Sequence, residues 1–257
     1  MNSYSKQNFK IPEESFDYAE ASTFVTQSIE NIIAEAIRKG ENKIILNTNL
    51  RHGLPMENIN KIAGPIVEAW AGELFENISS HDGNEWNLVH SEACSRLGMA
   101  DIILQFKKQT TFGSVVTANV DSKATAEDLE KSGKSPNITS FARIRSAYVE
   151  DADFIFVILS LKHKVFCQKN LNTGLMDGVM EVVNYKAYDL KYISEADLSY
   201  NPALGTGQLQ IRDVHYVNIQ TRTTWEFCQM LDAKFLSSSK KTFEDWLSLA
   251  EQNGWVK

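Results

Sequence analysis

The sequence has few cysteines, no long apolar run and no targeting segment, and each absence excludes a class of protein. Its three cysteines, Cys94, Cys167 and Cys228, are widely separated and odd in number, which fits neither a disulfide framework nor a zinc-binding spacing. No apolar stretch approaches the ~18 residues that a membrane span requires. The start, Met1–Lys6, lacks the apolar core of a secretory signal. We therefore expect free thiols, no membrane and a cytoplasmic location.

Internal repeats, low-complexity tracts and Pro/Gly/Ser-rich linkers are also missing. A chain of 257 residues fits one large domain. Its hydrophobic content of 43% and charged content of 23% are ordinary for a globular protein. Residues 1–20 are polar and irregular. The sequence predicts a single domain over 1–257, with an N-terminal arm at 1–20 and a catalytic and recognition core at 21–257.

The charge balance is acidic, with a formal net charge of −7. This argues against a protein that coats nucleic acid without specificity, because such binding rests on many phosphate contacts. It leaves room for a locally basic cleft and for uncompensated carboxylates that could hold a metal ion.

Apolar residues at helical spacing predict several helices. One covers Thr23–Lys39 and ends at Gly40, and a second covers 57–78, where Pro65 should force a kink or a fresh start. A third carries Ile138, Phe141, Ile144 and Tyr148 on one face, and two more close the chain at about 223–236 and 242–252.

Strand-like runs lie between these helices. Segment 99–125 predicts a hairpin with its turn at 107–113, and 153–161 is almost continuously apolar, as in a central strand. Further strands are expected near 179–193 and 207–219. The order predicts an α/β fold, a mixed central β-sheet flanked by helices.

Two carboxylates and a lysine lie on the predicted hairpin. Asp101 opens one apolar run, and the second run ends in Asp121-Ser122-Lys123. Because residues alternate faces along a strand, Asp121 and Lys123 project to the same side. Two carboxylates beside an ammonium suit Mg²⁺-assisted attack of water on a phosphodiester. The alternative is a solvated Asp–Lys pair at a strand end.

Glu68 lies on the second predicted helix. It shares a stripe with small and aromatic residues, which are Gly64, Ala71, Gly72 and Phe75. Helix packing could bring its carboxylate to the strand ends as a metal ligand or as a support for one. The alternative is an ordinary glutamate on a helix surface.

A polar loop, Ser132–Asn137, follows the hairpin. It lacks the preceding glycine of a phosphate-binding loop. Asn suits bidentate contact with adenine, and Lys suits phosphate or guanine. The alternative is that Ser135, Pro136 and Asn137 cap the next helix. On that helix, Arg143 and Arg145 face either phosphate or solvent.

Short motifs now follow one another in a recognisable order. They are Met99–Leu104, Val120–Thr125 and Lys134–Ser140, with Gly64-x-x-x-Glu68 upstream and Gln208–Arg212, then Thr221–Phe227, downstream. Over roughly 60–230 this order resembles the type II restriction endonucleases of the PD-(D/E)XK superfamily, especially the EcoRV- and HincII-like branch. Ala100 stands where the family often has proline.

The resemblance implies a restriction-endonuclease-like fold and Mg²⁺-dependent, site-specific cleavage of double-stranded DNA in a bacterial restriction–modification system. The implied metal ligands are Asp101, Asp121 and the Ser122 carbonyl, with Lys123 beside the attacking water and Glu68 in support. The implied DNA contacts come from Lys134, Ser135, Asn137, Thr139 and Arg212.

Cleavage of a palindrome in both strands requires two such sites, so a symmetric homodimer is expected. Two alternatives stay open on the sequence alone. One is a repair or junction nuclease of the same fold that recognises DNA structure, and the other is a DNA-binding module without catalysis.

Overall fold

The computed structural model describes residues 3–95, 98–108, 114–129, 132–203 and 205–257. Its contacts divide the chain into two compact units. The catalytic candidates lie in the unit formed by Thr23–Gly133 and Val157–Tyr188, which we call the hairpin unit. The recognition candidates lie in the other, formed by Met1–Ser22, Lys134–Phe156 and Asp189–Lys257, which we call the terminal unit. That the chain acts as one domain over 1–257 stays a prediction.

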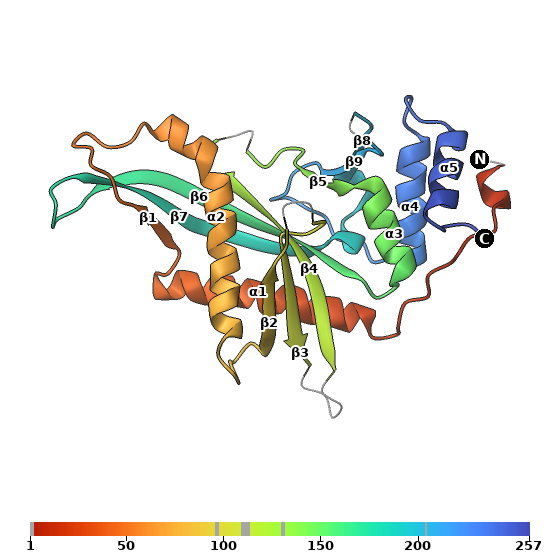
Figure 1. Ribbon diagram of the computed structural model, residues 1–257, viewed down its shortest axis with the longest axis horizontal. Coiled ribbons are helices and arrows are strands. Elements are labelled where there is room, and N and C mark those ends of the chain that lie inside the picture. Colours follow the sequence, from red (N-terminus) through yellow and green to blue (C-terminus); the bar gives the residue numbers. More distant parts are fainter. Residues whose placement is uncertain (1–2, 96–97, 109–113, 130–131, 204) are drawn as a thin grey trace. The chain divides into compact units, whose positions relative to one another are not determined.

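A six-stranded sheet in the order β1-β7-β6-β4-β3-β2 is central to the hairpin unit. Its strands are β1 (Lys43–Leu46), β2 (Leu88–Ala93), β3 (Ile102–Lys107), β4 (Val115–Ala126), β6 (Ile155–Lys169) and β7 (Met176–Asp189). Figure 1 shows β6 and β7 as a long curved ribbon. The start of β6 is buried without interruption, which confirms the central strand expected from its apolar run.

The predicted hairpin is the antiparallel pair of β3 and β4. Ile102 lies opposite Val120, and Lys107 lies opposite Val115. The Asp101 N–H donates to the Val120 carbonyl at 2.9 Å, so this register fixes Asp101 beside Val120, at the open end of the hairpin. Residues 109–113 of the predicted turn lie outside the described residues.

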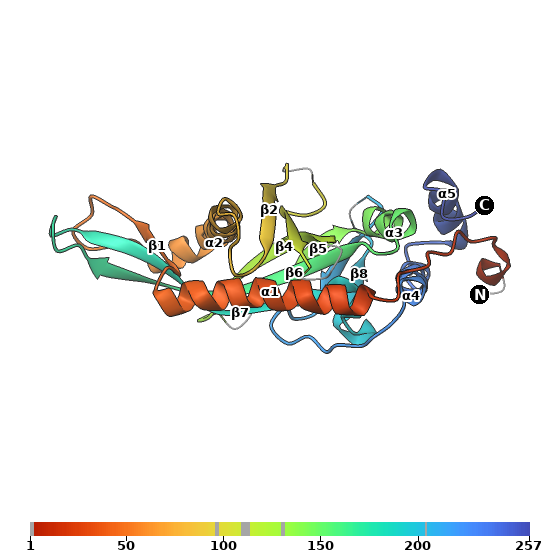
Figure 2. The ribbon, with the colours of Figure 1, turned by 90° about the horizontal axis from the view of Figure 1, so that it is seen from below.

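Two long helices belong largely to the hairpin unit. α1 (Tyr18–Lys39) ends before Gly40, as predicted, where the backbone turns to φ 78°. α2 (Met56–Ser79) continues through Pro65, so of the two alternatives, a kink or a fresh start, the fresh start is excluded. Pro65 is exposed, and water can bond the carbonyl that loses its donor. Figure 2 shows α1 along its length and α2 nearly end-on, so the helices cross steeply. Among the described residues no helix could cross a membrane.

The terminal unit holds a three-stranded sheet in the order β5-β9-β8. Its strands are β5 (Asn137–Ser140), β8 (Leu198–Asn201) and β9 (Gln208–Ile211), and its helices are α3 (Phe141–Glu150), α4 (Thr224–Leu236) and α5 (Phe243–Gln252). Short 3₁₀ helices lie at Tyr4–Lys6, Leu190–Tyr192 and Glu195–Asp197. The two predicted C-terminal helices are confirmed, and each begins with a capping box.

The region around Asn137 differs from the expectation. Residues 137–140 form β5, and α3 begins only at Phe141 with Ser140 as its N-cap. The β-branched side chains of Ile138 and Thr139 are buried in the strand, where such residues pack well. The alternative that Ser135, Pro136 and Asn137 cap the helix is therefore wrong.

Arg145 faces neither phosphate nor solvent. Its side chain is fully buried and lies 3.1 Å from the equally buried Asp232 carboxylate. Tyr4 donates its hydroxyl to the same carboxylate at 2.7 Å, and the guanidinium lies 5.1 Å from the centre of the Trp255 ring. This ion pair joins the N-terminal segment to α3 and α4.

Replacing Asp232 by alanine should destabilise the fold, because it leaves the Arg145 charge buried without its partner. We expect a loss of about 3–5 kcal/mol in the free energy of unfolding, measured by urea denaturation. The double variant Arg145→Met/Asp232→Leu removes both charges and should recover most of that stability. A loss below about 1 kcal/mol for Asp232→Ala would contradict a structural role for the pair.

Candidate active site

Two residues of β4 and the residue before β3 bring their charged groups together. Lys123 Nζ lies 2.7 Å from Asp121 Oδ1, as expected for residues two apart on one strand. The Asp101 carboxylate accepts a hydrogen bond from the Ser122 N–H at 2.8 Å. The β3–β4 register therefore sets both carboxylates and the ammonium at one end of the hairpin.

Asp121 carries its charge in a buried position. Its side chain is 6% exposed, and burial raises the pKa of its carboxyl to about 7. Lys123 lowers that pKa, while Asp101 and Glu68 raise it further. Among the described residues, its Oδ2 atom is buried without a hydrogen-bond partner. Such an oxygen is satisfied either by a proton, which the raised pKa favours, or by a bound cation.

The donor set fits a hard cation. Asp101 is exposed, so its carboxylate is open to a ligand beside the free oxygen of Asp121. Carboxylate and backbone carbonyl oxygens are the ligands that Mg²⁺ prefers. Within the described ranges, no three side chains of the His, Cys, Asp and Glu types group as a metal site. A cation here would therefore rest on two carboxylates and other oxygens, such as the Ser122 carbonyl.

Glu68 lies on the side of α2 that packs toward β4. Its Oε1 atom accepts a hydrogen bond from the Ala124 N–H at 3.3 Å. Ala71 and Phe75 of the same stripe are fully buried. Burial raises the pKa of the Glu68 carboxyl, and Lys123 lowers it. Glu68 thus contacts the β4 backbone one residue beyond Lys123.

The candidate DNA contacts lie in the terminal unit. Lys134, Ser135, Asn137 and Arg212 are exposed. Lys134 forms an ion pair with Asp213, a partner distant in sequence that no local pattern indicates. Thr139 is only 6% exposed. The expectation that its side chain contacts DNA is corrected, because it packs inside this unit.

Asn137 and Gln210 lie opposite each other on β5 and β9. Gln210 Nε2 lies 2.9 Å from Asn137 Oδ1 and 3.3 Å from the Ser135 carbonyl oxygen. Sequence reasoning noticed Gln210 only within a motif, since nothing local connects two residues so far apart. The pairing joins the loop to the neighbouring strand.

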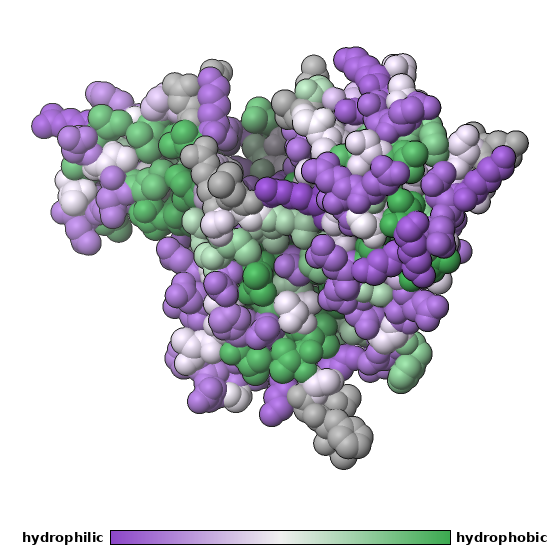
Figure 3. All heavy atoms as spheres, turned by 45° about the vertical axis from the view of Figure 1, so that its right-hand side comes forward, coloured by the Kyte–Doolittle hydropathy of each residue, from purple (hydrophilic) through white to green (hydrophobic). Residues whose placement is uncertain are grey.

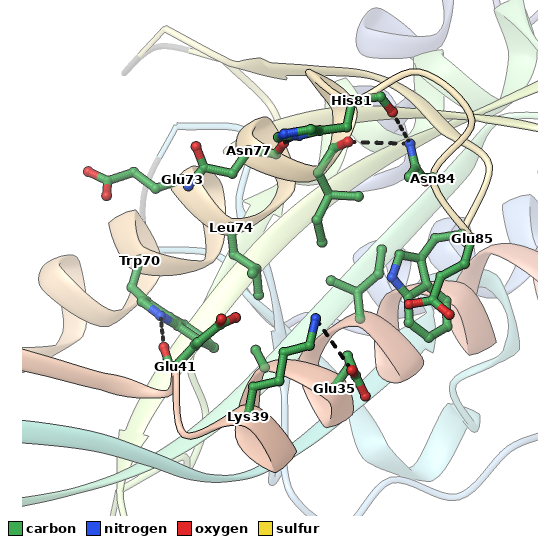
Figure 4. A pocket seen from close by; sticks show the side chains of 14 residues that line it. Glu35, Lys39, Glu41, Trp70, Glu73, Leu74, Asn77, His81, Asn84 and Glu85 are labelled. Atoms are coloured by element: carbon green, nitrogen blue, oxygen red, sulfur yellow. Dashed lines mark hydrogen bonds and ion pairs between the residues drawn. The ribbon is translucent and has the colours of Figure 1, made fainter.

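A separate cavity of about 610 Å³ lies between α1 and α2 (Figure 4). None of the candidate catalytic residues lines it. Several of its polar groups bond one another: Lys39 Nζ lies 3.4 Å from Glu35, and the Trp70 indole donates to the Glu41 carbonyl at 3.0 Å. This cavity is therefore distinct from the carboxylate cluster.

Comparisons with known proteins identify the family of this chain. The family model of the type II restriction endonuclease HpaI matches residues 5–254. The type II restriction enzyme HpaI of Haemophilus parainfluenzae is 54% identical over 254 residues, covering 99% of each chain. Among solved structures, the NlaIV restriction endonuclease superposes with a TM-score of 0.44 and 10% identity, covering 88% of this chain and 87% of that chain.

The family match covers almost the whole chain, including both groups of candidate residues. It decides against the repair nuclease and the non-catalytic module as alternatives. The chain belongs to the HpaI family of type II restriction endonucleases and is a site-specific DNA endonuclease of a restriction system.

Proposed function

We propose that this endonuclease hydrolyses the phosphodiester bonds of double-stranded DNA with Mg²⁺ as cofactor, held by Asp101, Asp121 and the Ser122 carbonyl. The observation that carries the proposal is the buried, unpartnered Oδ2 of Asp121 beside an exposed second carboxylate. When bound, Mg²⁺ supplies stabilisation of the charge that develops on the reacting phosphate.

Lys123 acts on the attacking water and on the phosphate. Its ammonium is held 2.7 Å from Asp121, so it points into the carboxylate cluster. From there it donates hydrogen bonds that orient the water and stabilise the negative charge of the transition state. Glu68 is a positioning residue, because it holds the β4 backbone at Ala124 and its charge attracts Lys123.

The exposed residues of the terminal unit bind the DNA. Lys134 and Arg212 carry charges suited to phosphate, and Ser135 and Asn137 carry groups suited to hydrogen bonding. Asn137 is the base reader in this proposal. Thr139 supports this DNA-binding surface as part of strand β5, and its own buried side chain makes no contact with the DNA.

A symmetric homodimer follows from the chemistry, because two strands cut at one palindrome require two sites. Apolar side chains on the surface of the hairpin unit support it (Figure 3). The large apolar residues exposed in this unit include Ile45, Leu50, Ile62 and Leu171, and exposed apolar surface is commonly buried at interfaces. We further propose a location in the bacterial cytoplasm, where free cysteines are stable.

Asp101→Ala and Asp121→Ala should each abolish cleavage, because each removes an anionic oxygen from a hard cation. Binding to DNA without metal should survive or strengthen, since a negative charge facing phosphate is lost. The assay is cleavage of genomic DNA with Mg²⁺, with circular dichroism to check folding. Glu73→Ala, an exposed acid of α2, is the matched control. Normal cleavage by either aspartate variant would refute the site.

Lys123→Ala should slow cleavage by ~10²–10³ or more, the usual cost of losing a group that stabilises transition-state charge. DNA affinity should change far less. Single-turnover rates and equilibrium binding separate the two effects, with Lys107→Ala, an exposed lysine of β3, as control. Weaker binding with a normal single-turnover rate would mean that Lys123 only anchors phosphate.

Asn137→Ala should lower the preference for the cognate duplex over a duplex with one base changed, by ~1–3 kcal/mol. The exposed side chain caps no helix, so the melting temperature should stay unchanged. Competitive cleavage of the two duplexes measures the preference. An unaltered preference would remove Asn137 from base recognition.

A further inference from the structure

Asn137, the proposed base-contacting residue, is paired with a second amide side chain, that of Gln210. The two lie opposite each other on antiparallel strands, so their side chains project from the same face of the small sheet. Their hydrogen bond of 2.9 Å lies at an exposed position. Two neutral amides joined at the surface are therefore presented together to whatever binds that face.

The orientation of the Gln210 amide follows from its second contact. Its Nε2 end lies 3.3 Å from the Ser135 carbonyl oxygen, and a carbonyl can only accept a hydrogen bond. The nitrogen end of Gln210 must therefore face Ser135. The Ser135 backbone is itself held, with φ 49° and its N–H donated to the Arg212 carbonyl at 3.1 Å.

The orientation of the Asn137 amide follows in turn. Gln210 presents an N–H toward Asn137, so the atom that meets it must be the Asn137 oxygen. The Asn137 NH₂ group then points away from Gln210. Among the described residues, the protein supplies no partner to Asn137 Nδ2 or to Gln210 Oε1. The pair thus offers donors on one residue and an acceptor on the other.

We propose that Gln210 and Asn137 read one base as a unit, in which Gln210 fixes the Asn137 NH₂ group outward and supplies its own Oε1 as the neighbouring acceptor. The matching partner is a base edge with an acceptor beside a donor. Adenine presents this pattern in the major groove through N7 and N6, whereas guanine presents two acceptors. Guanine would bring its O6 against Gln210 Oε1 and is disfavoured.

This inference rests on the proposed role of Asn137, and its test separates the two. A library of random duplexes is cleaved by wild type, Asn137→Ala, Gln210→Ala and Gln210→Glu, and the ends are sequenced. Gln208→Ala is the matched control: the same residue type on the same face of β9, two positions away and opposite Ser140. Thermal melts show that each variant is folded.

We expect Gln210→Ala to relax the same base position as Asn137→Ala, with discrimination against the changed base falling about 5- to 150-fold. All other positions of the site should stay fixed, and Gln208→Ala should match wild type. Gln210→Glu should lower the preference for adenine at this position more than Gln210→Ala does. Its carboxylate only accepts, so the Asn137 amide turns over and presents oxygen toward adenine N7.

Relaxation of different positions by the two alanine variants would overturn the inference. A wild-type profile for Gln210→Ala, with a relaxed one for Asn137→Ala, would overturn it while leaving Asn137 as the reader. If no folded variant relaxes any position although wild type cuts at discrete sites, both the inference and the proposed role of Asn137 fail.

Discussion

The buried charge of Asp121 constrains the whole hairpin unit. A carboxylate on a side chain that is 6% exposed loses most of its hydration, and burial alone shifts it toward the neutral form. Lys123 offsets this through an ion pair at 2.7 Å, but Asp101 and Glu68 add negative charge around it. The cluster holds more negative than positive charge, so a bound cation stabilises what the protein alone leaves unbalanced. In the proposed mechanism, the bound metal ion supplies this missing positive charge beside Asp121.

That placement depends on parts of the chain that supply no ligand. The β3–β4 register sets Asp101 beside Val120, and the Ser122 N–H orients the Asp101 carboxylate. Helix α2 then packs its buried stripe, including Ala71 and Phe75, against the same sheet. This packing brings Glu68 to Ala124 and secures the strand on which Lys123 stands. A change in that stripe should therefore displace Lys123, the proposed catalytic lysine, through the backbone of β4.

The sequence indicated the features that depend on neighbours along the chain. The alternation of Asp121 and Lys123, the apolar run of β6 and the ends of α4 and α5 are local properties, and they were predicted correctly. Strands β1, β2 and β8 were missed, because short strands with few fully buried residues lack a distinct hydrophobic pattern. The third predicted helix is α3, which carries Phe141, Ile144 and Tyr148 as expected. Ile138 lies instead in β5, since pairing with β9 outweighed the local periodicity.

Contacts between distant residues set the limit of sequence reasoning here. The sequence predicts Arg145 on the protein surface. In the structure its side chain is fully buried, because Asp232 neutralises its charge and Tyr4 donates a hydrogen bond to the same Asp232 carboxylate. The sequence allows Asn137 to be a helix cap or a base-contacting residue. Its hydrogen bond with Gln210 sets which end of its amide is left to face a ligand. Both outcomes are set by strand and helix packing rather than by the residue itself.

The net negative charge of the chain bears on how general attraction to DNA and discrimination between bases are divided among its residues. A net charge of −7 gives little general attraction to DNA, so non-specific affinity should be weak. In the proposed recognition, discrimination rests on oriented neutral groups, which lose hydrogen bonds when the wrong base faces them. An amide pair whose direction is fixed by a backbone carbonyl suits that task, because it cannot rotate to accommodate a different base edge without breaking its own contacts.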